Sequence, residues 1–245
     1  MTVLCRVLGV SRSGFYDWCR RAPDPGRVAL IGRVRRIHRQ KRRSYGSRRM
    51  AVALTREGER TGRDKARRLM REARIRCRQR RRFRITTDSA HDAPVAPNRL
   101  QRCFTVGRPN RVWVADITAI WGVNDWLYLA AVLDLFDRQV VGWALAGHMR
   151  GTLVRSALEM AVGRRRPPSG LLHHSDQGCQ YAAGDYRRLL GQHGMVASMS
   201  RRGDCWDNAV MERFFGSLKS EWLHGQAYTT ATEVRRDVID YIEIE

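Results

Sequence analysis

Three acidic residues have the types and spacing for metal-dependent phosphoryl chemistry. Asp116 stands in the β-rich segment VWVADIT, Asp176 follows the apolar run of LLHHSDQGCQY, and Glu212 lies in the helical pattern DNAVMERFFGSLKSEW. The first two are separated by 59 residues and the last two by 35. Carboxylates from separate elements can hold paired divalent cations over a phosphodiester. These three residues are therefore candidate catalytic and metal-binding groups.

Each carboxylate also has an ordinary structural interpretation, and the residues alone leave both open. Asp116 alternates with Val114 and Thr118 on one strand face, where an acid could instead form a salt bridge or mark a strand end. Asp176, in Ser-Asp-Gln-Gly, could be a turn residue. Glu212 lies at the rim of an apolar helical stripe, and a Glu in that place is usually only a surface residue.

The segment around Glu212 has the period of a helix with one buried face. The residues expected to face the core are Met211, Phe215, Leu218 and Trp222. Asn208, Glu212 and Lys219 form the neighbouring face. From there the carboxylate can reach a metal beside the sheet edge, and Lys219 can reach a phosphate.

Basic residues are concentrated in the N-terminal part of the chain, whose overall net charge is +22. Residues 1–110 hold 31 Lys and Arg against 8 Asp and Glu, whereas residues 111–245 hold 15 against 16. This asymmetry predicts a polyanion-binding region attached to a nearly neutral domain. Neutralising about 6 phosphates would lower affinity roughly a thousandfold between 50 and 200 mM salt. The alternative is a charged, solvated surface.

Residues 1–77 are predicted to form a helical, helix-turn-helix DNA-binding region. Within residues 3–20, Gly9 provides the turn, Ser11 is a plausible N-cap, and Phe15 and Trp18 would face the first helix.

Three further helical patterns cover residues 28–42, 47–59 and 63–75. The last of them directs apolar residues inward and four arginines outward, where they could contact DNA or be ordinary solvated charges. These four candidate DNA-binding residues are Arg63, Arg67, Arg71 and Arg74.

Residues 78–110 lack periodicity and are predicted to be a basic linker. Strand patterns then follow at 111–122, 126–138 and 139–147, the first two separated by a hairpin signal. Helix and strand patterns alternate afterwards, ending in a long helix from about residue 207. Periodicity alone gives only an α/β or α+β domain.

Several classes of function are disfavoured by what the sequence lacks. Its six cysteines form no Cys-x-x-Cys pair, and His173, His174 and Cys179 lack a second pair of zinc ligands, so we expect reduced thiols and no zinc. There is no phosphate loop for ATP. No apolar run approaches the roughly 18–20 residues that span a membrane, and no signal peptide is recognisable. We therefore expect a cytoplasmic, nucleoid-associated protein with no membrane partner.

Long motifs closely resemble one family. HHSDQGCQY, SMSRRGDCWDNAVMERFFGSLKSEW and VWVADIT are similar to the DDE transposases of bacterial insertion sequences, specifically the second-frame product of the insertion sequence 3 family. That family shares its integrase catalytic core with retroviral integrases, and the 35-residue gap before Glu212 matches its spacing. LGVSRSGFYDW, SYGSRRM and KARRLMRE also fit, so the resemblance covers essentially the whole chain.

The resemblance implies a fold and a chemistry. The fold would be α/β, a ribonuclease H-like mixed sheet with helices on both faces, spanning residues 111–245 and preceded by an all-α helix-turn-helix region. The three carboxylates would bind two Mg²⁺ or Mn²⁺ ions and cleave and join DNA strands at insertion-sequence ends by transesterification. Lys219 and Arg213 would contact the substrate strand. Residues that support the metal site are expected among His174, Gln177 and Asn208.

The implied partners are double-stranded DNA, both terminal inverted repeats and target, further copies of the chain on DNA, and an upstream-frame helix-turn-helix product. The chain stops at YIEIE where relatives continue, so the catalytic domain is expected to be truncated at its C-terminus. An alternative is a catalytically impaired copy that acts only as a DNA-binding protein at element ends. A ribonuclease H-like nuclease that does not join strands is a third interpretation, against which the expected end recognition by residues 1–77 argues.

Overall fold

The chain folds into two compact units, residues 1–78 and 79–245. The computed structural model describes residues 2–20, 24–77, 94–122, 125–201, 204–223, 226 and 228–243. Among the helices in these ranges, none combines the length and the apolar character needed to cross a bilayer.

The first unit contains a three-helix core made of α3 (Pro25–Gln40), α4 (Ser47–Arg56) and α5 (Arg63–Glu72). These helices confirm the three predicted patterns. Helix α3 begins earlier than expected because the Asp24 carboxylate accepts a hydrogen bond from Gly26 N (3.0 Å) and Pro25 occupies the first turn. The buried side chains are Leu30, Val34, Ile37, Met50, Ala51, Leu54, Ala66, Leu69, Met70 and Ala73.

The same unit begins with the short helices α1 (Thr2–Val7) and α2 (Arg12–Arg20). Gly9 makes the turn between them at φ +62°, and Ser11 Oγ accepts from Gly14 N at 3.0 Å, so both expectations hold. The expectation that Trp18 packs on the first helix is wrong, because its side chain is 69% exposed. Helix α1 has only six residues, which is too short to cover the aromatic face of α2.

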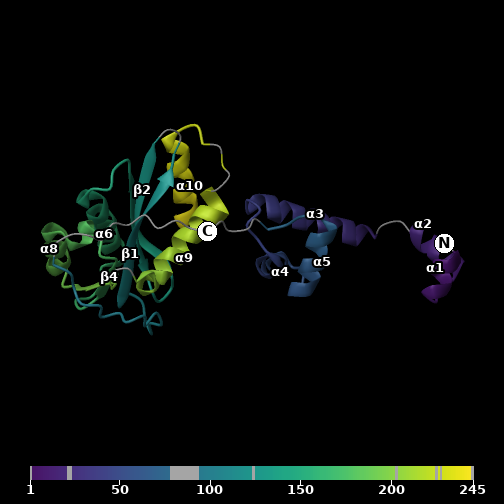
Figure 1. Ribbon diagram of the computed structural model, residues 1–245, viewed down its shortest axis with the longest axis horizontal. Coiled ribbons are helices and arrows are strands. Elements are labelled where there is room, and N and C mark those ends of the chain that lie inside the picture. The colour runs from purple at the N-terminus through teal and green to yellow at the C-terminus, as the bar shows by residue number, and fades with distance from the viewer. Residues whose placement is uncertain are drawn as a thin grey trace. The chain divides into compact units, whose positions relative to one another are not determined.

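The second unit is built on one five-stranded sheet in the order β3-β2-β1-β4-β5 (Figure 1). The strands are β1 (Val112–Trp121), β2 (Trp126–Asp134), β3 (Val140–Ala146), β4 (Leu172–Ser175) and β5 (Val196–Met199). The first three pair antiparallel, β4 pairs parallel to β1, and β5 pairs parallel to β4. This mixed order confirms the ribonuclease H-like topology.

Helices cover both faces of the sheet, as expected. Figure 1 shows α6 and α8 against one face and α9 and α10 against the other. The helices are α6 (Gly151–Arg165), α7 (Cys179–Ala182), α8 (Gly184–Gln192), η1 (Cys205–Asn208), α9 (Ala209–Ser217), η2 (Leu218–Leu223) and α10 (Ala231–Glu243). The single helix predicted from about residue 207 is therefore three consecutive pieces: a 3₁₀ turn, an α-helix and a π-helix.

Alternation along β1 separates two hydrophobic cores. Trp113 and Ala115 belong to the core under α6 and α8. Val114 and Ile120 belong to the core under α9 and α10. Asp116 shares the parity of Val114 and Ile120, so its side chain is directed to the α9 side of the sheet.

The segment that precedes β1 also packs on this unit. Residues 94–110, which the sequence assigns to the second half of a linker, include Leu100, which is buried in the α9-side core. The backbone N–H groups of Arg99 and Leu100 donate to Ser198 Oγ at 2.9 and 3.3 Å. Residues 78–93, the first half of that linker, lie outside the described residues.

Candidate functional site

Parallel pairing of β1 and β4 brings two of the three candidate carboxylates into one row. Val112 is opposite Leu172, and Val114 is opposite His174. Asp116 comes two residues after Val114, and Asp176 comes two residues after His174, directly past the end of β4. The same register therefore places both carboxylates next to one another at the end of the shorter strand.

Asp116 lies in a half-buried position among other charges. Its Oδ1 accepts a hydrogen bond from Ile117 N at 2.7 Å. Burial raises the pKa of Asp116 well above its ordinary value, and the charges of Asp176 and Glu212 raise it further. The Ile117 N–H and the Lys219 ammonium oppose that rise. A bound divalent ion would offset the negative charge of these carboxylates.

The loop after β4 holds the Asp176 carboxylate by hydrogen bonds. Asp176 Oδ1 accepts from Gly178 N at 3.0 Å, and Gln177 Nε2 donates to Ser200 O at 2.9 Å. A Cβ on Gly178 would lie 3.0 Å from Asp176 Oδ1 and 3.1 Å from Gln180 Oε1. The absence of a side chain at Gly178 therefore leaves room for the Asp176 carboxylate. The Gln177 hydrogen bond holds the loop against the end of β5.

Glu212 lies in the first turn of α9, and Asn208 anchors that turn to β1. Asn208 Nδ2 donates to Ala115 O at 3.3 Å, one residue from Asp116. Met211 and Phe215 are buried beneath the helix, as predicted, and leave the Glu212 side chain exposed. Partial burial of its carboxyl group raises the pKa of Glu212.

Lys219 and Arg213, both expected to contact the substrate strand, lie in different surroundings. Burial lowers the pKa of Lys219 while the Asp116 charge raises it, so this amine lies within the electrostatic reach of Asp116. Arg213 is exposed and lines a separate hollow of about 580 Å³ with Phe104 and Tyr241. The structure thus brings Lys219, but not Arg213, to the carboxylates.

His174 is a neutral, buried ring that contacts two serine hydroxyls beside the Asp176 loop. It is fully buried, with Nδ1 2.9 Å from Ser198 Oγ and Nε2 3.2 Å from Ser200 Oγ. Burial lowers the pKa of His174 to about 4. His173 points to the opposite side of the sheet, where its Nε2 is 3.1 Å from the Tyr186 hydroxyl.

The donor set around Asp116 suits a hard divalent cation, although the side chains do not converge fully. All candidate ligands are oxygens, which Mg²⁺ and Mn²⁺ prefer. Asn208 Oδ1 is buried beside them and accepts no hydrogen bond from the described residues. Within these same residues, no three His, Cys, Asp or Glu side chains stand close enough to form a metal cluster. The structure thus pairs Asp116 with Asp176 and places Glu212 near them, outside a closed cluster.

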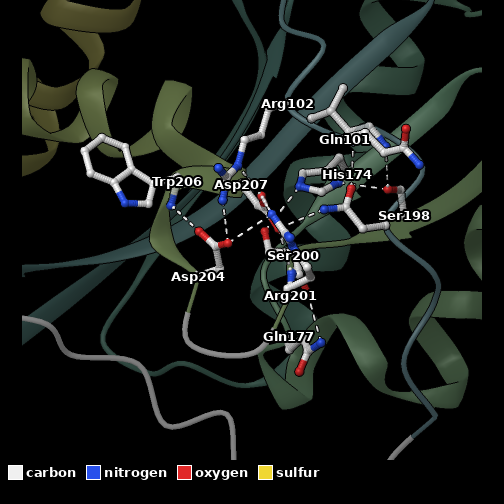
Figure 2. Close-up of polar contacts among 12 residues, drawn as sticks. Gln101, Arg102, His174, Gln177, Ser198, Ser200, Arg201, Asp204, Trp206 and Asp207 are labelled. Carbon is white, nitrogen blue, oxygen red and sulfur yellow. Dashed lines mark hydrogen bonds and ion pairs between the residues drawn. The ribbon is translucent and has the colours of Figure 1, made fainter.

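Sequence reasoning missed Asp207, which holds the start of α9 in place (Figure 2). Its side chain is fully buried and accepts hydrogen bonds from three residues. The donors are Asn98 Nδ2 and Arg102 Nε, both at 2.8 Å, and Arg201 N at 3.0 Å, Nε at 3.0 Å and Nη2 at 3.1 Å. The Arg201 hydrogen bonds are the main reason that the pKa of Asp207 is far below its ordinary value.

This Asp207 network joins three distant stretches of the chain at the base of the Glu212 helix. Asn98 and Arg102 precede β1, Arg201 follows β5, and Asp207 itself lies in η1. Asp204 binds the same two guanidinium groups, at 2.5 Å from Arg102 and 3.0 Å from Arg201. An Asp-Asn pair before an apolar helical run is a helix-start signal, so this residue was recognisable as a cap, but its partners were not.

The four arginines predicted to bind DNA from the third helix of the first unit are all exposed. Arg63, Arg67 and Arg71 lie along α5, and Arg74 follows its end at φ +54°.

Three family models match this chain. A model described as an integrase core domain matches residues 107–205, and a second model with that description matches residues 193–244. A model described as an HTH-like domain matches residues 26–83.

The chain is similar over nearly its whole length to proteins of insertion elements. It is 43% identical over 244 residues to the uncharacterized 31 kDa protein of insertion element IS600 from Shigella sonnei, covering 98% of this chain and 90% of that protein. It is 36% identical over 251 residues to the transposase InsF of insertion sequence IS3A from Escherichia coli strain K12, covering 99% and 86%.

Two solved structures of viral proteins are similar to this chain at low sequence identity. An intasome of simian T-cell lymphotropic virus in complex with PP2A regulatory subunit B56 gamma gives a TM-score of 0.49 at 17% identity, covering 86% of this chain and 69% of that chain. The HTLV-2 integrase catalytic core domain in complex with magnesium gives 0.44 at 16% identity, covering 56% and 89%.

Proposed function

This chain belongs to the integrase-core transposases of the insertion sequence 3 family, and we propose that it cleaves and joins DNA strands at the ends of its element with Asp116, Asp176 and Glu212. The observation that carries the assignment is the environment of Asp116. This carboxylate is half-buried, adjoins Asp176 through the parallel register, and interacts with the charges of Glu212 and Lys219. Stability alone gives no reason to place two carboxylates side by side in a half-buried position with a third carboxylate near them.

The three carboxylates, with the Asn208 amide oxygen beside them, would hold Mg²⁺ or Mn²⁺. Bound ions would favour deprotonation of an attacking water or DNA 3′-hydroxyl and offset charge on the leaving oxygen. The chain's own groups do the positioning. Gln177 and Gly178 fix the Asp176 loop, Asn208 fixes the first turn of α9 against β1, and Lys219 offers a cation to a nearby phosphate.

The first unit would bind the DNA to be cut. Its match to an HTH-like model and the positive charge of residues 1–110 support this role. Assembly of several copies on DNA, with both element ends and a target, is part of the same proposal.

The test is strand cleavage and joining on a duplex that carries an element end with flanking DNA, in the presence of Mn²⁺. Asp116→Asn, Asp176→Asn and Glu212→Gln should each lower product formation by at least about a thousandfold, since each removes a charged metal ligand. Binding of the same duplex should change by less than about threefold. Asp185→Asn is the matched control, because Asp185 is exposed on α8 at the other face of the sheet.

The outcomes separate this function from its alternatives. A triple carboxylate variant that still nicks the duplex would remove the catalytic assignment. An unaltered chain that binds ends yet forms neither nicked nor joined product in Mn²⁺ would indicate a DNA-binding protein only. Cleavage without any joined product would indicate a nuclease.

A further inference from the structure

A hollow of about 610 Å³ in the first unit is surrounded by arginines. It lies where α3 and α5 end, and its floor includes His38 and Ile75. Five exposed arginines form its wall, and we call them the arginine rim: Arg35, Arg39, Arg43, Arg74 and Arg76. Among the described residues that line the hollow, none is acidic.

Three glutamates of this unit form ion pairs with basic residues outside the rim. Glu72 pairs with Arg27 at 2.6 Å, and Glu57 pairs with Arg36 at 2.6 Å. Glu59 receives both Arg33 and Lys65. None of the rim arginines has a carboxylate partner within the part of the chain that the structure describes. The rim is therefore a concentration of like charge that folding alone disfavours.

The backbone brings the rim together at some cost. Arg43 and Arg74 have φ values of +63° and +54°, a left-handed conformation that glycine adopts more readily at the end of a helix. Arg43 N donates to His38 O, and His38 Nε2 is 3.1 Å from Arg76 O, so the two helix ends are tied to each other. Two arginines in positions suited to glycine, both on one hollow, indicate a use for their charge.

We propose that the arginine rim is a binding site for the phosphate backbone of duplex DNA, an inference that rests on the DNA-binding role proposed above. Guanidinium groups hold phosphate oxygens through two parallel hydrogen bonds. The rim stands on the last turns of α3 and on the residues that follow α3 and α5. Base reading instead needs a helix face that projects into the major groove. The exposed face of α5, with Arg63 and Arg67, is free for that second task. The rim fixes the position of the DNA and does not read its sequence.

The test compares two triple variants of the full chain that carry equal charge changes. The rim variant combines Arg39→Gln, Arg43→Gln and Arg74→Gln. The control variant combines Arg27→Gln, Arg33→Gln and Arg36→Gln, which removes arginines that already have carboxylate partners. Binding to an element-end duplex and to a scrambled duplex of equal length is measured by fluorescence anisotropy between 50 and 200 mM salt. Thermal melting confirms that each variant is folded at the assay temperature.

The rim variant should reduce the slope of log K against log salt by about 2 to 3, because each lost phosphate contact removes about 0.9. Both duplexes should lose affinity by the same factor, roughly tenfold or more at 100 mM salt. The control variant should change the slope by less than about 1. Replacing the three rim residues with Lys should largely retain the slope, since charge is kept.

Three results would overturn the inference. A rim variant with the slope and affinity of the unaltered chain would show that the hollow binds no phosphate. Weakening confined to the element-end duplex would show that these arginines read bases. If the unaltered chain binds neither duplex, the proposed function itself fails, and this site fails with it.

Discussion

Replacing Asp207 with Asn should destabilise the second unit, because the change removes a fully buried negative charge that pairs with Arg102 and Arg201 at the start of α9. Asn has nearly the same shape, so packing around it is preserved. One carboxylate oxygen becomes an NH₂ group, which then faces donors such as Asn98 Nδ2 or Arg201 N. The substitution thus exchanges charge-assisted hydrogen bonds for opposed donors.

The size of the effect follows from the exposure of the partners. Breaking a fully buried ion pair costs about 3–5 kcal/mol. The side chains of Arg102 and Arg201 are 44% and 62% exposed, so water can solvate them after the change. We therefore expect a loss of about 2–3 kcal/mol in the free energy of unfolding, or a melting temperature lower by roughly 5–10 °C.

The matched control is Asp204→Asn. Asp204 binds the same two guanidinium groups, but its side chain is 23% exposed. It should cost about 1 kcal/mol or less. Thermal and urea melts of both variants against the unaltered chain measure the difference.

The pH dependence gives a second measurement. Because the pKa of Asp207 is lower in the folded chain than in the unfolded chain, its stabilisation is complete above the unfolded value of about 3.9 and is lost as pH falls through the folded value. The penalty of Asp207→Asn should therefore be constant between pH 5 and 8 and shrink only below about pH 4. Equal penalties for the two variants, or a penalty that changes between pH 5 and 8, would refute this account of the network.

Three further changes test the packing and the electrostatics of the site. Gly178→Ala should reduce strand cleavage by roughly tenfold or more with little change in melting temperature, because the new methyl group would displace the Asp176 carboxylate; unchanged cleavage would contradict this. Gly142→Ala should destabilise the second unit by about 3 kcal/mol, since its Cβ would lie 2.2 Å from Ala157 O. Gly163→Ala is the control: this residue of α6 has open space around it, and the change should stabilise the unit by about 0.5–1 kcal/mol. Equal stabilities of the two variants in urea melts would be inconsistent with the close approach of β3 and α6. Lys219→Gln should move the acidic limb of the cleavage pH profile to higher pH, because Asp116 loses a cation that lowers its pKa. Lys219→Arg keeps the cation and should leave the acidic limb in place. Coinciding profiles for Lys219→Gln and the unaltered chain would place Lys219 outside the electrostatic reach of Asp116.

The parts of the fold with strong local periodicity could be predicted from the sequence. The alternation of β1 predicts which residues face each side of the sheet, and the helical repeat of Met211, Phe215 and Leu218 predicts the buried face of the helix. Both predictions agree with the burial in the structure. The three candidate carboxylates were selected from the sequence because long motifs surround each of them. The approach of Asp116 to Asp176 depends on the register of β1 against β4, which no local pattern specifies.

Contacts between segments that are distant in the sequence could not be predicted from local patterns. Asp207 receives donors from Asn98 and Arg102, more than a hundred residues earlier, and no periodic signal connects those positions. Leu100 was assigned to a linker because its neighbours are polar and irregular, yet it is buried. Trp18 shows the opposite error, since helical spacing alone cannot tell whether a partner surface is large enough to cover a side chain.

The parallel pairing of β1 with β4 also has a consequence for synthesis on the ribosome. The hairpin strands β1, β2 and β3 are complete by residue 146, well before β4 at 172–175 has been made. An emerging chain can therefore form a sheet that displays Asp116 before Asp176 and Glu212 have been made. Under the function proposed above, competence to cut nucleic acid would arise only late in translation, after β4 inserts beside β1 and the helix with Glu212 follows.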